Sequence, residues 1–319
     1  YCCGHRLDHS RGGPFMNIKQ ALLFGIEILE KKSDQPSRDA SLLLSHILKH
    51  PSEYLYLHPE RGITSEDLAA YSRLLKRRAS YEPVAYILGY KEFMGLRFKV
   101  DQRVLIPRPE TEVLVETALG LAGEILAENM VGGETSGGKL LKAGKAGAFT
   151  VCDIGCGSGA IGLSMLKFQP GISKMLLTDV SQGALDLAAE NARLGKAEFL
   201  LGDGLNPLKL KGLEGEVDMI LSNPPYIPEH VIDTLEPQIK CFEPRIALDG
   251  GRLGTDKIHR LIVNAPVFLK HNGDMILEIG HDQADICKEA LSQLSHFWSR
   301  WWPVCDYSGI ERVFVAQRS

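Results

Sequence analysis

Four consecutive residues, Asn223-Pro224-Pro225-Tyr226, combine groups that could hold a planar nitrogen group. The two prolines fix φ at two positions and remove two backbone donors, which predicts rigid, outward-facing carbonyls. The asparagine side chain offers one acceptor and two donors, and the tyrosine offers a flat ring. Together these groups suit the –NH₂ of an amide or of a base. The structural alternative is simply a rigid loop that follows a strand.

A glycine-rich loop lies further upstream, at Gly155-Cys156-Gly157-Ser158-Gly159, between a predicted strand and a predicted helix. Glycines let the backbone pass close to a ligand, and a helix N-terminus offers free N–H groups. Asp179 follows twenty residues after Gly159, at the end of the next predicted strand, where a carboxylate can bind ribose hydroxyls. This pair indicates an adenosine-type ligand, and both NAD and S-adenosylmethionine remain open.

Asp203 and Gly204 come directly after a third predicted strand. The carboxyl ends of parallel strands line the ligand crevice in sheets of this kind. We therefore expect a group at Asp203 to reach the adenine of such a ligand, with an ordinary turn aspartate as the alternative.

Residues 223–226 favour S-adenosylmethionine over NAD. An amide or exocyclic amine nitrogen is a poor nucleophile because its lone pair is delocalised, whereas the sulfonium methyl is already a good electrophile. Hydrogen bonds from the nitrogen to Asn223 Oδ1 and the Pro224 carbonyl would localise the lone pair and aim it at the methyl. A nicotinamide dehydrogenase needs no such motif. The sequence therefore predicts methyl transfer to nitrogen.

The elements that must position these groups fall into two parts. Residues 16–82 show a helical period, with apolar stripes from Ile18 and from Ala40 and a capping box from Thr64 to Asp67. Lys76-Arg77-Arg78 ends the third helix, either as a solvated end or as a contact for an acidic partner or RNA. Residues 83–104 are expected to form a β-hairpin linker, with 86–88 and 96–100 as its strands. Residues 1–15 are expected to be an extension outside the fold.

From residue 105 onward strands and helices alternate, which predicts an α/β domain with a mostly parallel sheet. Pro109 suits a first helical position, opening a helix to about residue 127. Glycines mark a surface insertion at 129–147. Two final segments, 303–307 and 312–316, are expected to form a hairpin with one strand antiparallel at the sheet edge. The predicted strands are 149–154, 174–178, 198–201, 217–221 and 274–278, and the predicted helices 160–168, 182–194, 256–269 and 283–294.

The composition limits the classes of protein to which this chain could belong. The chain has 319 residues, a net charge of −4 and no apolar run long enough for a membrane helix. A basic excess, usual for an obligate nucleic-acid binder, is absent. Its seven cysteines include no CxxC pair, so buried reduced thiols are expected and no metal site is predicted. None of the histidines sits in a motif, and no catalytic histidine is assigned.

The sequence resembles the HemK/PrmC family of class I amino-methyltransferases. The resemblance rests on the glycine loop, Asp179, residues 223–226 and four further stretches, at 83–89, 93–96, 105–112 and 243–251. Members of that family methylate N5 of the glutamine in the Gly-Gly-Gln motif of class 1 peptide-chain release factors. The resemblance implies a Rossmann-like methyltransferase domain at 105–319, a release-factor docking domain at 16–82, and S-adenosyl-L-methionine as cofactor, with S-adenosyl-L-homocysteine as product.

The resemblance also implies roles for particular residues. Catalysis and substrate binding are expected at Asn223, Pro224, Pro225 and Tyr226. Cofactor binding is expected at Gly155, Cys156, Gly157, Ser158, Gly159, Asp179, Asp203, Gly204, Asn223, Arg108, Glu110 and Thr111. Some family members carry a large aromatic at the position of Gly204, so stacking on the adenine is lost here. A capped helix start is the structural alternative for residues 108–111.

The implied protein is a cytoplasmic monomer that tunes translation termination, without DNA or a membrane as a partner. Two rival functions remain open. A DNA or RNA adenine methyltransferase would grip an adenine amine with the same tetrapeptide, but it normally needs a basic groove or target-recognition domain. The other rival is a non-catalytic protein that binds a release factor or the ribosome.

Overall fold

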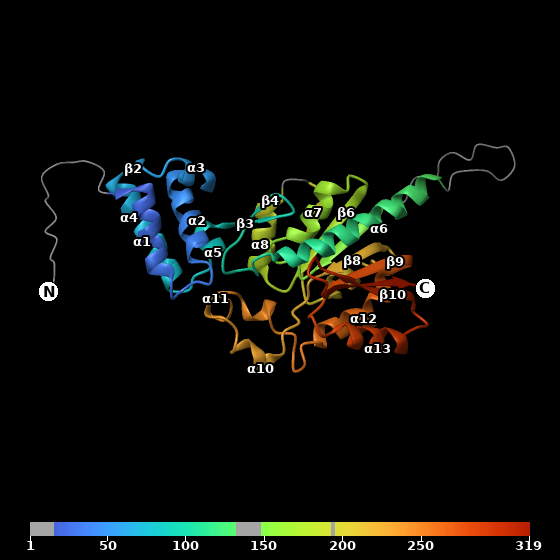
Figure 1. Cartoon of the computed structure of the whole chain (residues 1–319). Coiled ribbons are helices and arrows are strands. Elements are labelled where there is room, and N and C mark those ends of the chain that lie inside the picture. Colours follow the sequence, from blue (N-terminus) through green and yellow to red (C-terminus); the bar gives the residue numbers. More distant parts are fainter. Residues whose placement is uncertain (1–15, 132–147, 193–194) are drawn as a thin grey trace, which may run out of the picture. The chain divides into compact units, whose positions relative to one another are not determined.

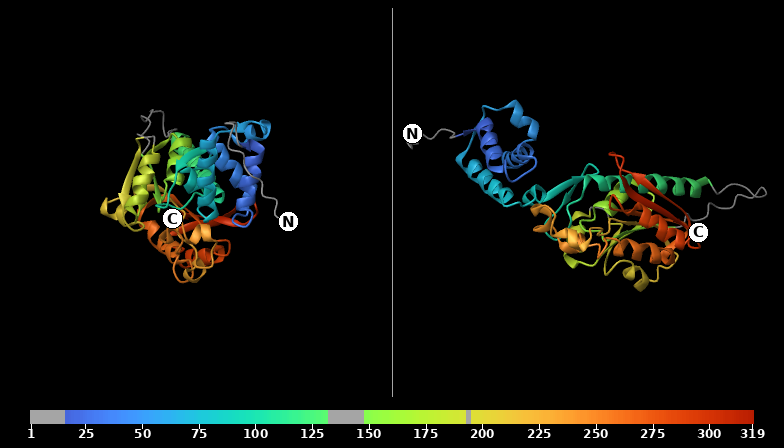
Figure 2. Two further views of the ribbon diagram at one scale, coloured as in Figure 1. Left: turned by 90° about the vertical axis from the view of Figure 1, so that its left-hand side faces the viewer. Right: turned by 60° about the horizontal axis from the view of Figure 1, so that its bottom comes forward.

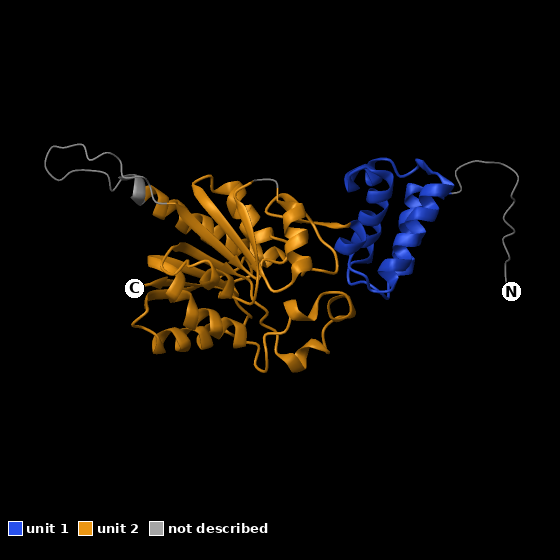
Figure 3. Cartoon of the chain, turned by 180° about the vertical axis from the view of Figure 1, so that it is seen from behind, with its two compact units in different colours: residues 1–88 blue, residues 89–319 orange. Residues whose placement is uncertain are grey.

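The computed structural model describes residues 16–131, 148–192 and 195–319. The expected extension at 1–15 and residues 132–147 of the expected insertion lie outside the described residues. Two compact units make up the chain, with the boundary between Leu88 and Gly89 (Figure 3). Within the described residues, no helix is both long and apolar enough to cross a bilayer.

The first unit is helical, as expected. Its helices are α1 (Ile18–Leu29), α2 (Pro36–Leu48), α3 (Ser52–Leu57), α4 (Ser65–Ala79) and α5 (Val84–Leu88), and a short antiparallel pair joins β1 (Met16–Asn17) to β2 (Gly62–Ile63). Side chains cap two of the helices: Asn17 forms a capping box on α1, and Thr64 accepts the backbone N–H of Asp67 at 3.1 Å. These caps satisfy donors that the first helical turn leaves free.

The cationic end of α4 is only partly solvated. Arg78 is buried and its Nε donates to Asp39 Oδ2 at 2.6 Å, while Arg77 pairs with Glu82 at 2.6 Å. The Ser33 hydroxyl also donates to Asp39, at 2.6 Å. Arg78 is therefore part of the core of this unit, which corrects both sequence-based interpretations for that residue. Its charge ties α4 to α2.

The expected hairpin is present, but its first strand was assigned wrongly. Residues 86–88 lie in helix α5, and the strands are β3 (Tyr90–Phe93) and β4 (Leu96–Lys99), joined by Met94-Gly95. Gly89 has a φ of +78°, a left-handed conformation that separates helix from strand. Phe93 and Phe98 are buried in the core of the second unit, so the hairpin belongs to that unit rather than to a separate linker.

A seven-stranded sheet lies in the second unit, in the order β10-β11-β9-β8-β5-β6-β7. Strands β6, β8, β9 and β10 of this sheet are labelled in Figure 1. Neighbours from β9 to β7 run parallel, and β11 lies antiparallel to both β9 and β10, which confirms the expected C-terminal hairpin. The strands are β5 (Phe149–Ile154), β6 (Ile172–Asp179), β7 (Ala197–Leu201), β8 (Val217–Ser222), β9 (Leu269–Glu278), β10 (Trp298–Cys305) and β11 (Glu311–Arg318).

Helices cover both faces of this sheet (Figure 2). One face packs on α6 (Glu112–Val131), α7 (Ala160–Phe168) and α8 (Gln182–Asn191). The other packs on α9 (Asn206–Leu210), α12 (Asp256–Phe268) and α13 (Ala284–Gln293). Successive residues of β5 alternate between the two cores, as the pleat requires. The 3₁₀ helices η1 (Pro109–Thr111) and η2 (Arg245–Ala247) and the short helices α10 (Glu229–Ile232) and α11 (Pro237–Lys240) lie in the connections.

The cysteines only partly match the expectation of buried thiols. Cys152, Cys156 and Cys287 are buried, whereas Cys241 and Cys305 are exposed. Burial raises the pKa of the Cys287 thiol to about 12, so this thiol stays protonated at neutral pH.

Candidate active site at the carboxyl ends of the strands

The sheet register brings the polar motifs to one edge. Ile154 of β5 pairs with Thr178 of β6, and Ser222 of β8 pairs with Leu277 of β9. The glycine loop, Asp179, residues 223–226 and the last residue of β9, Glu278, therefore all begin at the same level of the sheet. This is the edge at which open parallel sheets bind ligands.

The glycine loop turns sharply back over β6. The backbone N–H groups of Gly155 and Cys156 both donate to the Thr178 carbonyl, at 2.8 and 2.9 Å. Gly155, Gly157 and Gly159 have φ values of +70°, +53° and +77°. A Cβ at either of the first two would meet nothing within 4 Å, so the space above that part of the loop is open. Non-glycine residues would strain this turn.

Asp179 is bonded to the loop that it faces. Its Oδ2 accepts the Gly157 N–H at 3.0 Å, and its Oδ1 accepts the Ser181 N–H at 2.9 Å. Burial raises the pKa of this carboxyl, and the backbone donors offset part of that increase. Each oxygen keeps a further lone pair for a ligand hydroxyl.

A second carboxylate under the loop was not identified from the sequence. Asp153 of β5 is fully buried, and its Oδ2 accepts the Gly162 N–H of α7 at 2.9 Å. Its Oδ1 has no hydrogen-bond partner among the described residues. Burial raises the pKa of Asp153 to about 7. The available signal was an acidic residue inside a strand that is otherwise apolar except for Thr150, because a carboxylate is rarely fully buried without a partner.

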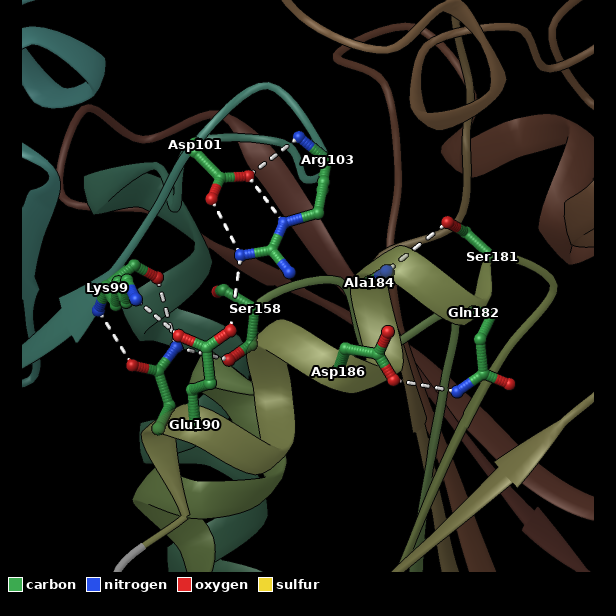
Figure 4. Close-up of polar contacts among 10 residues, drawn as sticks. Lys99, Asp101, Arg103, Ser158, Ser181, Gln182, Ala184, Asp186 and Glu190 are labelled. Carbon is green, nitrogen blue, oxygen red and sulfur yellow. Dashed lines mark hydrogen bonds and ion pairs between the residues drawn. The ribbon is translucent and has the colours of Figure 1, made fainter.

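The rim of the loop is anchored by α8, the end of β4 and the segment that follows β4 (Figure 4). Asn191 donates to the Ser158 carbonyl at 2.9 Å and exchanges two hydrogen bonds with the backbone of Lys99, at 2.7 and 3.0 Å. Glu190 pairs with Lys99 and, at 3.3 Å, with Arg103. These contacts hold the far side of the glycine loop.

Asp203 forms an exposed ion pair with Arg260 at 2.9 Å. It lies at the expected strand end, after β7, but its carboxylate is engaged by a cation from α12. Gly204 beside it has a φ of +58° and its carbonyl accepts the Thr178 hydroxyl at 3.4 Å.

Asn223 contacts a residue from a distant part of the chain. Its Nδ2 donates to Thr111 Oγ1, the last residue of η1, at 3.2 Å. With the amide nitrogen held in this way, Oδ1 is the atom left to accept from a substrate. Thr111 is 4 % exposed, so it lies beneath Asn223 rather than on the surface.

Tyr226 is held at both its ring end and its backbone. The hydroxyl donates to Glu278 Oε1 at 3.2 Å, and the carbonyl accepts the Gln283 side chain at 3.0 Å. Burial raises the tyrosine pKa, and the neighbouring Glu278 charge raises it further. Tyr226 is therefore a neutral, oriented ring at neutral pH.

Arg108 and Glu110 behave differently from Thr111. Arg108 Nη2 donates to buried Glu243 at 2.7 Å, linking the segment before α6 to the loop after β8. Glu110 is exposed. Of the three residues expected at the cofactor pocket, one binds Asn223 and one binds Glu243. Sequence reasoning had not singled out Glu243 or Glu278 as site residues.

The edge has the chemistry that S-adenosylmethionine requires. Open glycine backbone lies above the end of β5, an acceptor carboxylate lies at the end of β6, and the next residue, Val180, is 49 % exposed beside it. The carboxylate can accept hydrogen bonds from the ribose hydroxyls of an adenosine, and the apolar side chain can pack against its adenine. Residues 155–159 and Asp179 therefore fit this cofactor.

Comparison with known families and proteins adds to this geometry. Residues 20–89 match the family model of the PrmC N-terminal domain, and residues 138–237 match the methyltransferase small domain. A release factor glutamine methyltransferase from Koribacter versatilis is 36% identical over 95% of this chain and 99% of its own length. One of the same description from Aquifex aeolicus is 35% identical over 92% of this chain and 95% of its own length.

Among solved structures, the catalytic domain of hMettl16, in complex with a MAT2A 3′UTR hairpin, resembles this chain with a TM-score of 0.50. The alignment covers 76% of this chain and 81% of that one, at 14% identity. At this identity the likeness concerns the fold alone.

Proposed function

The chain belongs to the release factor glutamine methyltransferase family, and from this premise we propose that it methylates the side-chain amide nitrogen of a glutamine. The substrate is the glutamine of the Gly-Gly-Gln motif in class 1 peptide-chain release factors, so the reaction tunes translation termination. The observation that carries this proposal is the Asn223–Thr111 hydrogen bond of 3.2 Å, which leaves Asn223 Oδ1 as an acceptor for an amide –NH₂.

The residues after β8 hold the substrate nitrogen in this proposal. Asn223 Oδ1 and the Pro224 carbonyl accept its two hydrogens, while Pro225 keeps the segment rigid and the Tyr226 ring supports the amide plane. These bonds strengthen as positive charge develops on the nitrogen, so they stabilise the transition state more than the ground state. No base is needed before transfer, because the proton leaves once the nitrogen carries the methyl group.

S-adenosyl-L-methionine, when bound, supplies the methyl group on a sulfonium and leaves as S-adenosyl-L-homocysteine. The backbone of residues 155–159, including Cys156 and Ser158, would cradle it, and Asp179 would accept from its ribose. Asp203 and Gly204 would border the adenine. Arg108 and Glu110 would shape the mouth of the pocket, whereas the contact with Asn223 supports a different role for Thr111.

The helical unit would dock the body of the release factor, so that its loop reaches the other unit. The expected monomer and cytoplasmic location belong to the same proposal. Neither DNA nor a membrane is expected as a partner.

A mass measurement tests the function. Purified protein is incubated with S-adenosylmethionine and either a release factor or adenine-containing DNA. We expect the release factor to gain the mass of one methyl group, which maps to the glutamine of the Gly-Gly-Gln peptide. The mass of the DNA should stay unchanged. Methylation of the DNA alone would overturn the proposal. Tight binding of the release factor without methylation would indicate a non-catalytic binding protein.

A further inference from the structure

Gln283 is a buried polar side chain with no part in the transfer itself. It is the residue before α13 and is 4 % exposed. Its Nε2 donates to the Tyr226 carbonyl at 3.0 Å and to the Gly254 carbonyl at 3.2 Å. Its Oε1 accepts the Gly280 N–H at 2.8 Å. One side chain therefore joins three connections: the loop after β8, the segment before α12 and the turn after β9.

The partners of Gln283 leave only one direction for its amide. A carbonyl oxygen can only accept a hydrogen bond, and a backbone N–H can only donate one. An amide turned by half a rotation would place its oxygen against both carbonyls and its nitrogen against the Gly280 N–H. Buried groups left unpaired in this way are unfavourable. The hydrogen bonds themselves therefore fix the orientation of this side chain.

Glycine at position 254 lets the two carbonyls reach the same nitrogen. Gly254 has a φ of +76°, and a Cβ there would lie 2.4 Å from the Tyr226 carbonyl oxygen and 3.0 Å from the Pro228 ring. Any side chain at this position would push the two backbone segments apart. The close approach thus depends on a residue without a Cβ, and Gln283 bonds both segments where they meet.

The Tyr226 carbonyl is the downstream end of the segment 223–226. At the upstream end, the Ser222 hydroxyl donates to the Ile154 carbonyl at 2.7 Å, which ties the start of the segment to β5. The two prolines between these anchors have fixed φ angles. With both ends held, the Pro224 carbonyl, which is the proposed acceptor for a substrate hydrogen, has little freedom of direction left.

We propose that Gln283 is a positioning residue for methyl transfer: by fixing the Tyr226 carbonyl, it sets the Pro224 carbonyl and the Tyr226 ring against the substrate amide. The Tyr226 hydroxyl is held separately, by Glu278 at 3.2 Å, so the ring is fixed from its far end as well. A misplacement of about 1 Å can cost about a hundredfold in rate, because the reacting atoms lose their alignment. This role rests on the proposed function.

Two substitutions of similar size remove the donors. Gln283→Glu keeps an acceptor for the Gly280 N–H but turns its second oxygen toward the two carbonyls, whereas Gln283→Met removes donors and acceptor alike. For a Gly-Gly-Gln peptide, we expect kcat per S-adenosylmethionine-binding molecule to fall roughly tenfold to a hundredfold in both variants, and further in the glutamate variant. The KM for the peptide and the Kd for S-adenosylmethionine should stay within about threefold, because the loss is in the transition state.

Gln293→Glu is the matched control, since it makes the same chemical change at an exposed position of the same helix. Its kcat should equal that of wild type. If Gln283 only filled space, Gln283→Glu would also retain the wild-type kcat, because the two side chains have nearly the same shape.

Hydrogen exchange gives a readout that does not depend on activity. The Ile227 N–H follows the Tyr226 carbonyl directly and donates to the Leu248 carbonyl at 3.0 Å. In both Gln283 variants this N–H should exchange roughly tenfold faster, because local opening becomes easier. The Met275 N–H, in the centre of β9, should keep its protection.

Unchanged exchange at Ile227, or a wild-type kcat in both variants, would overturn the inference. A loss of S-adenosylmethionine binding in proportion to the loss of turnover would overturn it too, because Gln283 would then stabilise the whole unit rather than the segment 223–226. Wild-type protein that leaves the glutamine unmethylated would instead contradict the proposed function, and the exchange measurement would still test the contact of Gln283 with Tyr226.

Discussion

Asn223 is the residue on which the proposed transfer depends most directly, because one side-chain atom must accept from the reacting nitrogen. Its Nδ2 is already bonded to Thr111, so truncation removes the substrate contact and also frees a buried hydroxyl. The effect should therefore appear in turnover rather than in cofactor binding.

We expect Asn223→Ala to lose about 2–4 kcal/mol of transition-state stabilisation, or roughly 30- to 1,000-fold in kcat. Binding of S-adenosylmethionine should survive, and calorimetry would measure it. Asn206→Ala, at the exposed start of α9, is the matched control and should be neutral. Turnover of the Asn223 variant within twofold of wild type would show that the amide is held elsewhere.

The raised pKa of Asp153 predicts how the free energy of unfolding depends on pH. Its pKa in the folded chain is about 7, above the ordinary value of 3.8, because burial penalises the charged form. The folded state therefore binds the proton more tightly than the unfolded state does. The resulting contribution to the free energy of unfolding is complete below about pH 4 and is lost as the pH rises through about 7. At about 1.4 kcal/mol per pKa unit, the change amounts to a few kcal/mol.

Asp153→Asn removes this titration while keeping an oxygen for the Gly162 N–H. The free energy of unfolding of the variant, relative to wild type, should rise between pH 5 and pH 8 in urea titrations of the second unit. The exposed Asp282→Asn variant serves as the control and should show no such trend. A difference independent of pH would mean that Asp153 keeps its ordinary ionisation in the folded chain.

At the scale of elements, the turn between β5 and α7 is where backbone conformation matters most. Gly159 caps α7 with a φ of +77°, and a Cβ there would lie 2.9 Å from Leu163 Cδ1 and 3.3 Å from Ala188 Cβ. Both the conformation and the packing of α7 against α8 thus require a glycine.

Gly159→Ala should destabilise the protein by about 1–3 kcal/mol and weaken S-adenosylmethionine binding, because the strained turn would shift the loop. Gly120→Ala in α6 is the contrasting control, since a Cβ there meets nothing within 4 Å and helix propensity favours alanine by about 1 kcal/mol. Chemical denaturation and calorimetry would measure both quantities. An unchanged affinity for S-adenosylmethionine in the Gly159 variant would show that the conformation of the glycine loop does not matter for cofactor binding.

At the scale of the whole molecule, the two units have separate cores, so they can be perturbed separately. The buried Arg78–Asp39 pair lies in the first unit, and removing one partner of such a pair strands a buried charge at a cost of about 3–5 kcal/mol.

In the Arg78→Met variant, the first unit should therefore unfold at a lower denaturant concentration than in wild type. Binding of S-adenosylmethionine should stay intact. If that unit docks the release factor, methylation of an intact factor should fall far more than methylation of a short Gly-Gly-Gln peptide. Arg73→Met, at an exposed position of the same helix, is the control. Equal losses on both substrates would contradict the docking role.

Much of this molecule could be predicted from local sequence. The alternation of strands and helices, the glycine loop and the segment 223–226 are short-range patterns, and each reflects a local requirement of backbone or period. Residues 86–88 were mistaken for a strand because a short apolar run does not distinguish helix from strand. The Thr64 cap was predicted correctly because its partner is three residues away.

Contacts between distant segments were decided only by the tertiary structure. Thr111 and Asn223 are 112 positions apart, and Arg108 and Glu243 are 135 apart, so no local pattern could pair them. The buried carboxylates of Asp153 and Glu278 became visible only when the sheet register put them under the motifs. The sequence by itself determined which groups could do the chemistry. The packing of the sheet decided how those groups are oriented, because a hydrogen bond takes its direction from neighbours that the chain supplies from elsewhere.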